Sequence, residues 1–377
     1  SFLRPPLPYS CRTKMSEIKS NIAKWKIEEA DKPWVLGVHT LVPYLMKSPE
    51  VYEKTVLKDS KGQLPPYCVA MGDSRRVRAT ACLFDKGTGV VINDLMIENK
   101  KNPGRVAVAV GLYHGTPIVA FEHQMGSSGA EINVKEIIAK EQMTNTFKMG
   151  KVLFEADAKY VIRVGSAAGI NASKEEKMTP PELKAYDVVV ASHQVGISCA
   201  DYSALSGSIS SFDRSDAQKV KNRLIAMGYK MDSGRPVKNT DENLSKSLLA
   251  IVNEKLSFHN SSRENNSIKL GKAYSLGNVS KDSLYAETEE EAFLTLRKTL
   301  NVGSSEMEYA TITRIAAHQT LLGDPVKTSM AACILGTLPG DSFAEIDKSV
   351  SSLVTMSALL GALETLHKVS KAHMTTQ

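Results

Sequence analysis

The chain has 377 residues, of which 42% are hydrophobic and 23% charged, a composition typical of a globular protein with a sizeable core. It contains no run of eighteen or more apolar residues, so the sequence predicts no transmembrane segment. The net charge of +6 is modest and the lysines are scattered among acids, which gives no indication of a nucleic-acid-binding surface. An anionic small molecule is compatible with this balance.

The five cysteines lie far apart, without a C-x-x-C pair or a histidine at metal-ligand spacing, so neither a disulfide framework nor structural zinc is predicted. This usage indicates a reducing compartment and favours the cytoplasm. The first sixteen residues carry Arg4, Arg12 and Lys14 but no acid. A trimmed targeting segment has this character, which leaves a mitochondrial protein as the alternative; an expression scar or an arbitrarily cut tail would look the same.

Residues 1–65 are rich in proline and lysine, with short helical patterns at 17–27 and 42–56, and we interpret them as an N-terminal extension. From residue 66 to 377, short apolar runs alternate with amphipathic stretches, which predicts a single α/β domain with a mixed sheet and helices on both faces. Residues 201–215 and 257–268 are Ser/Asn-rich and predict loops. The predicted strands are 67–71, 106–112, 117–122, 160–164, 187–192 and 329–335. The predicted helices are 134–140, 143–156, 215–227, 241–255, 289–300, 306–320 and 343–372.

An arginine interrupts the apolar strand that begins at Val161. Val161, Ile162 and Val164 suit a strand covered on both faces, whereas Arg163 requires an anion. Gly165, Ser166 and Gly169 predict a flexible turn whose N–H groups and hydroxyl could bind phosphate together with Arg163. The alternative is a core strand whose arginine pairs with a neighbouring carboxylate.

Three further motifs are weak when each is taken alone. Gly72 ends an apolar strand and precedes an arginine-rich helix containing Arg76, a pattern that often only caps a helix. A glycine-rich turn follows Phe121. Glu306 and Glu308 flank Met307 at a predicted helix start, where carboxylates commonly complement the helix dipole.

Taken in order, the four motifs resemble the nucleoside phosphorylase and uridine phosphorylase family. That family carries a Gly-Asp-Pro-x-Arg turn, a Gly-Met-Gly turn, an Arg-x-Gly-Ser/Thr strand end and a Glu-Met-Glu helix. The resemblance implies one three-layer α/β domain around a mixed, partly barrel-like sheet, assembled as homodimers or higher homo-oligomers with sites at the subunit interface. It also implies phosphorolysis of a nucleoside to free base and ribose 1-phosphate, closest in character to uridine phosphorylase.

The resemblance assigns roles residue by residue. In this family a neighbouring subunit contributes an arginine and a histidine to each site. The arginine aligns with Gly104, one position before Arg105. The histidine aligns near Val35, about one helical turn before His39. The implied phosphate-binding residues are Gly72, Arg76, Arg163, Ser166 and Arg105. The implied ribose-binding residues are Met307, Glu308, Glu306 and His39.

The base-binding positions depart from the family pattern. Leu284 replaces the first residue of an aromatic pair and Tyr285 keeps the second, so stacking on the base is weakened. Residues 286–290 lack the glutamine and arginine that read uracil, which predicts a loss of uracil selectivity. Thr337 stands where purine-specific members place an aspartate, and Asp341 is only a fallback.

Two functions follow. The retained phosphate and ribose residues favour an active pentosyltransferase, with inorganic phosphate as co-substrate and no other cofactor or metal signature. The altered base positions, the extension and the Ser/Asn-rich loops suit a catalytically degenerate homologue serving as a structural or accessory subunit of a larger assembly. We favour the enzyme, on the strength of the resemblance.

Overall fold

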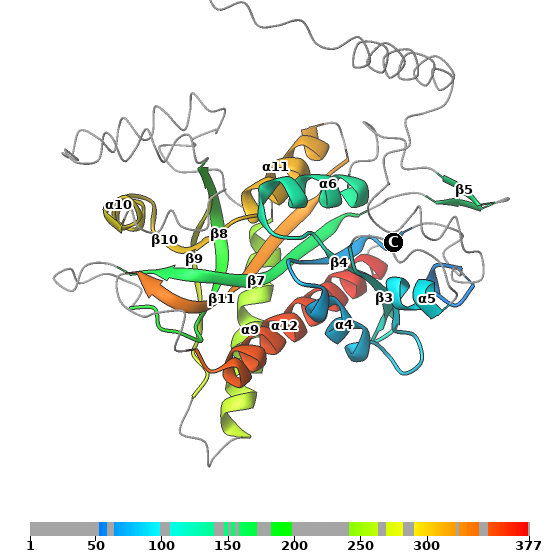
Figure 1. The fold of residues 1–377 in the computed structure, drawn as a ribbon, viewed down its shortest axis with the longest axis horizontal. Coiled ribbons are helices and arrows are strands. Elements are labelled where there is room, and N and C mark those ends of the chain that lie inside the picture. The colour runs from blue at the N-terminus through cyan, green and yellow to red at the C-terminus, as the bar shows by residue number, and fades with distance from the viewer. Residues whose placement is uncertain are drawn as a thin grey trace, which may run out of the picture.

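The computed structural model describes residues 53–58, 64–98, 106–138, 147–149, 152–154, 158–171, 182–197, 241–262, 269–281, 290–321, 324–338 and 346–375. Within these ranges the main feature is a mixed sheet of nine strands (Figure 1). In spatial order the strands are β10 (Val302–Glu306), β9 (Ala273–Lys281), β8 (Val188–Ile197), β11 (Lys327–Leu338), β7 (Tyr160–Ile170), β1 (Tyr67–Met71), β4 (Thr116–Glu122), β3 (Val108–Tyr113) and β2 (Val90–Val91).

One end of this sheet closes on itself. Strand β10 pairs in parallel with β9 and also returns antiparallel to β7, where Ser305 lies opposite Ala168. Strands β7, β11, β8, β9 and β10 therefore form a closed five-stranded barrel, and the remaining strands extend from β7 as an open sheet. The predicted single α/β fold around a mixed, partly barrel-like sheet is confirmed.

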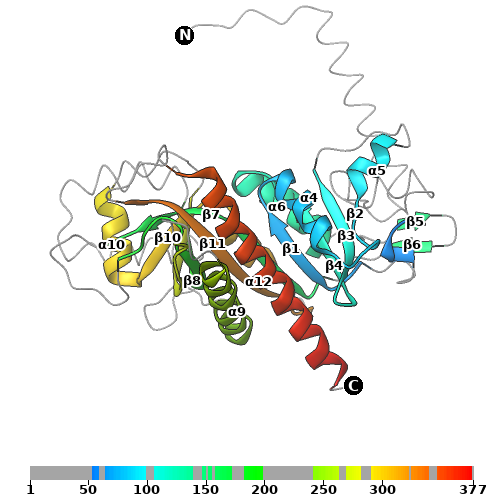
Figure 2. The ribbon, with the colours of Figure 1, turned by 90° about the horizontal axis from the view of Figure 1, so that it is seen from below.

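Helices cover both faces of the sheet, and one apolar cluster lies between the sheet and the helices on each face (Figures 1 and 2). On one face lie α5 (Ile92–Glu98), α6 (Gly126–Ile138) and α11 (Tyr309–Leu321); on the other lie α4 (Ser74–Leu83), α9 (Glu242–Ser261) and α12 (Lys348–Met374). Helix α10 (Glu290–Leu300) packs on the barrel end, against a smaller cluster. The nearly continuous burial of β1 and β7 follows from this double cover.

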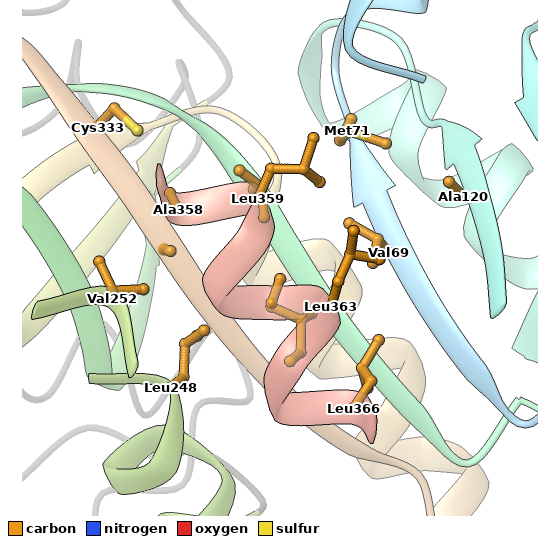
Figure 3. Close-up of a cluster of buried hydrophobic side chains, with 14 of the residues drawn as sticks. Val69, Met71, Ala120, Leu248, Val252, Cys333, Ala358, Leu359, Leu363 and Leu366 are labelled. Atoms are coloured by element: carbon orange, nitrogen blue, oxygen red, sulfur yellow. The ribbon is translucent and has the colours of Figure 1, made fainter. Parts of the chain in front are cut away.

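Helix α12 is a long, apolar helix of 27 residues. It alone in the described part of the chain is long and apolar enough to cross a membrane by length and composition, with a window of mean hydropathy 1.4 that is 56% buried. Leu359, Leu363 and Leu366 of α12 pack toward Val69 and Met71 of β1 (Figure 3). The apolar surface of this helix is therefore largely used by the protein core.

Several predicted elements were wrong. The stretch 143–156 is not a helix in its described residues, which form the antiparallel strands β5 (Phe147–Met149) and β6 (Val152–Phe154). Gly150 interrupts the helical pattern there, and the aromatic residues at 147 and 154 favour strands. The predicted loop at 257–268 begins inside α9, which continues to Ser261. Strands β2, β9 and β10 and helix α5 were not predicted, and in β9 buried polar residues masked the strand pattern.

The N-terminal side of residue 66 contributes to the core. Leu57, in the short 3-10 helix η1 (Val56–Lys58), and Leu64 are buried in the same cluster as Ile92 and Val110. The boundary at 65/66 stays a prediction, because residues 1–52 lie outside the described residues. The predicted helices 17–27 and 215–227 and the loop 201–215 also lie outside them.

Candidate functional site

The candidate site lies where the barrel separates from the open sheet. The turn predicted after Val164 was wrong, because β7 continues as a strand to Ile170. On one edge, β7 pairs with β1 as far as Val164 and with β10 only from Ala168, so residues 165–167 have no partner on that edge among the described strands. Such a split in a sheet is where α/β proteins commonly bind ligands.

Arg163 is the central charge of this split and is only 3% exposed. Its Nη2 lies 3.0 Å from Oε2 of Glu306 and also forms an ion pair with Glu308. Burial alone would lower the pKa of Arg163, but the two carboxylates outweigh it and raise that pKa above its ordinary value. Of the two alternatives that the sequence left open, the pairing with neighbouring carboxylates is present in the structure.

Gly165 makes this arrangement possible by its lack of a side chain. The guanidinium of Arg163 folds along the strand face, so that a Cβ at residue 165 would lie 2.4 Å from Nη1 and 2.7 Å from Cζ. Residues 163 and 165 share one face of the strand, which places any side chain at 165 directly in the path of the guanidinium. This glycine therefore serves a close approach and not a turn.

We expect Gly165→Ala to push the guanidinium off Glu306 and Glu308 and lower the free energy of unfolding by about 1–3 kcal/mol. Gly72→Ala is the matched control, because a Cβ there would meet its nearest neighbour at an ordinary 3.5 Å. Urea unfolding of both variants checks this expectation. Equal stability of the two proteins would show that Gly165 does not support the arginine.

Glu306 is the last residue of β10, and its carboxylate accepts several hydrogen bonds that fix the conformation of the Glu-Met-Glu segment. Its carboxylate accepts from Nδ2 of Asn278 at 2.9 Å, from the N–H of Glu308 at 2.9 Å and from the N–H of Tyr309 at 3.0 Å. Ser280 also donates to it. The predicted helix 306–320 therefore begins only at Tyr309, with Glu306 satisfying its first amides.

Glu308 links this segment to the glycine-rich turn after β4. Its Oε1 accepts from the N–H of Gly126 at 2.8 Å, and Oγ of Ser127 donates to the carbonyl of Met307 at 3.1 Å. Gly126 has a φ of 85°, a conformation that suits glycine. Two motifs about 180 residues apart in sequence thus meet beside Arg163.

Arg76 brings a second cation to the same place. Asp73 caps α4 and engages Arg75, with its carboxylate accepting from the Arg75 N–H at 2.8 Å. The half-buried side chain of Arg76 makes no hydrogen bond or ion pair within the described ranges. Burial lowers the pKa of Arg76, and the nearby Arg163 lowers it further. A desolvated cation without a counter-charge favours an anionic ligand.

Sequence reasoning missed His123, the residue immediately after β4. Its ring is fully buried, and a Cβ on Gly72 would lie 3.5 Å from its Cε1. Arg163, Glu306 and Arg76 all influence its pKa, so it belongs to the same cluster. A histidine in a loop carries no signal in the sequence; only the packing of β4 beside β1 brings it here. The supporting Asn278 and Ser280 were missed for the same reason.

The other predicted site residues are placed as follows. Ser166 is half-buried on β7, opposite Cys333 of β11. Thr337 is buried near the end of β11, beside Gly169. The described residues hold no cluster of three or more side chains that could bind a metal ion. The predicted residues outside the described ranges are His39, Arg105, Leu284 and Tyr285.

A partly closed mixed sheet with two arginines and a Glu-Met-Glu segment at its split defines the class of protein, an α/β protein with a candidate anion site. A sequence model of the phosphorylase superfamily matches residues 68–321, and the chain belongs to that superfamily. This confirms the resemblance that the four ordered motifs indicate.

Solved structures agree on the fold. The chain is similar to a uridine phosphorylase of the oomycete Phytophthora capsici, with a TM-score of 0.57 and 16% identity, covering 81% of this chain and 93% of that one. It is also similar to a nucleoside phosphorylase of Trypanosoma brucei described as showing uridine phosphorylase activity, with a TM-score of 0.52 and 17% identity, covering 82% and 95%. No curated protein sequence matches the chain.

Proposed function

We propose that the protein is a nucleoside phosphorylase of the uridine phosphorylase type. Inorganic phosphate would attack the anomeric carbon of a nucleoside, the N-glycosidic bond would break, and free base and ribose 1-phosphate would leave. Membership of the phosphorylase superfamily and the uridine phosphorylase activity of similar folds support this proposal. The observation that carries it is that Arg76 has no ion-pair partner among the described residues and lies near Arg163, which itself pairs with Glu308 at the split of the sheet.

The chemistry follows from these groups. A phosphate in the split would be held by the guanidinium of Arg76, by the free Nε–H of Arg163 and by the hydroxyl of Ser166. The buried carboxylate of Glu308 retains lone pairs for ribose hydroxyls, and Met307 would pack along the sugar. A fixed carboxylate under the ribose favours a transition state in which positive charge develops on the sugar.

The remaining features of the proposal rest on the family resemblance. Leu284, Tyr285 and Thr337 would contact the base, and Arg105 and His39 would complete the site of a neighbouring subunit in a homodimer. Inorganic phosphate is the co-substrate, and no other cofactor is proposed. The cytoplasm is the proposed compartment.

A second candidate function has its own supporting observation. Arg163 already forms ion pairs with both Glu306 and Glu308, so its charge is balanced without phosphate. A site neutralised from within suits a catalytically degenerate homologue that serves as a subunit of a larger assembly. The free Arg76 favours the enzyme, because a purely structural protein gains nothing from a desolvated, unpaired cation.

Turnover in phosphate buffer decides between the two. We expect release of base and ribose 1-phosphate from uridine, inosine or a related nucleoside, strictly dependent on phosphate. Arg76→Ala should lower kcat/KM by about 10²-fold or more. Arg78→Ala is the matched control on the same helix, because Arg78 is exposed and pairs with Asp94 at 2.8 Å.

Thermal unfolding with and without phosphate distinguishes two possible negative results. If phosphate raises the unfolding temperature but no nucleoside is cleaved, the degenerate homologue is supported. If phosphate gives no thermal stabilisation and no nucleoside is cleaved, the assignment of the phosphate site itself is wrong.

A further inference from the structure

His123 has one ring nitrogen that no side chain or backbone group of the described residues uses. Its Nδ1 lies 2.6 Å from the carbonyl oxygen of Gln124. A carbonyl can only accept, so Nδ1 carries the proton, and the neutral ring presents Nε2 as a bare lone pair. Nε2 is buried and has no hydrogen-bond partner within the part of the chain that the structure describes. Buried polar atoms without partners are rare, because each costs free energy, so this atom indicates a ligand.

A second unpartnered atom of opposite character lies in the same cluster. Nε of Arg163 is a buried N–H donor with no acceptor among the described residues, whereas Nη2 of the same guanidinium forms ion pairs with Glu306 and Glu308. A ligand group that both donates and accepts has the chemistry that these two atoms lack. A monoprotonated phosphate is such a group, since its P–OH donates and its other oxygens accept.

We propose that His123 accepts a hydrogen bond from the P–OH of a monoprotonated phosphate and makes the site selective for protonated oxyanions over sulfate. The inference rests on the proposed function, because it assumes that phosphate enters the split beside Arg76 and Arg163. Sulfate carries no proton near neutral pH, so its oxygen would face the Nε2 lone pair without a hydrogen bond. A site built to bind a hydroxyl strongly rejects an isostere that lacks it.

The surroundings of His123 keep this lone pair available. The charged groups that act on the ring are the cations Arg163 of β7 and Arg76 of α4 and the anion Glu306 of β10. Burial, reinforced by the two guanidinium groups, lowers the pKa of His123 to about 3, although Glu306 and the Gln124 carbonyl oppose the shift. The ring is therefore neutral in the empty site at neutral pH. Inorganic phosphate itself gains a second proton below about pH 7, so the monoprotonated species becomes scarce and the preference over sulfate should shrink as the pH falls.

Calorimetric titration of the full chain with inorganic phosphate, arsenate and sulfate, at constant ionic strength and at about pH 8 and pH 5.5, tests the proposal. At the higher pH, phosphate and arsenate should bind at least about tenfold more tightly than sulfate. At the lower pH the ratio should narrow. In His123→Gln the ratio should fall toward one at both pH values, because a side-chain amide can turn its N–H toward sulfate.

The outcomes separate this inference from the function on which it rests. Equal binding of phosphate and sulfate by the wild type at about pH 8 would overturn the role of His123 and leave the phosphate site intact. An unchanged preference for phosphate in His123→Gln would do the same. Binding of none of the three anions would overturn both proposals. If His123→Gln does not fold, the wild-type ratio and its change with pH still decide.

Discussion

Arg163→Ala is expected to lower the free energy of unfolding by about 3–5 kcal/mol, because it removes the only cation that forms an ion pair with two buried carboxylates in the described structure. Glu306 is 4% exposed and Glu308 is 5% exposed, so neither carboxylate regains water when the guanidinium is lost. Urea unfolding at neutral pH measures the loss. The same variant should also lose the thermal stabilisation that phosphate gives the wild type.

Arg76→Ala is the comparison that separates stability from ligand binding. Arg76 has no ion-pair partner among the described residues, so its removal leaves no buried carboxylate uncompensated, and we expect a change in unfolding free energy within about 1 kcal/mol. Stabilisation by phosphate should nevertheless disappear. A loss of several kcal/mol in Arg76→Ala, or none in Arg163→Ala, would contradict the division of labour between the two arginines.

His123 is expected to make the protein less stable in acid. The unfolded chain binds a proton at this histidine with a pKa near 6.5, whereas burial lowers the folded-state pKa to about 3. Between these values the unfolded state holds more protons, so stability is complete above about pH 6.5 and declines as the pH falls toward 3. The decline should reach about 1.4 kcal/mol for each pH unit.

Urea unfolding of wild type and His123→Gln, in buffers without phosphate and between about pH 4 and pH 7, checks this expectation. In His123→Gln the unfolding free energy should depend less steeply on pH, because the contribution of His123 is removed. His114→Asn changes an exposed histidine in the β3–β4 turn and serves as the control for replacing a histidine outside the candidate site. Identical slopes in wild type and His123→Gln would falsify the buried neutral state of this ring.

Most of the fold could be predicted from patterns with a local cause. The apolar runs of β1 and β4 and the helical periodicity of α9 and α12 follow from burial on a doubly covered sheet, and these elements lie close to their predicted positions. Strand β9 escaped prediction because Asn278 and Ser280 are buried yet polar, and their partners come from strands β8 and β10 and from helix α11. A single sequence does not reveal such long-range pairing.

The candidate site likewise combines residues that local motifs predict with contacts that only the tertiary structure decides. The sequence by itself determined the superfamily and marked Gly72, Arg76, Arg163, Glu306 and Glu308, because these residues sit in motifs that are short and local. The tertiary structure decided what each group contacts. It turned a predicted glycine turn into a continuous strand, paired Arg163 with two carboxylates about 145 residues away, and placed His123 beside both arginines. Charge pairing and desolvation depend on distances in space, and those distances exist only once the barrel has closed.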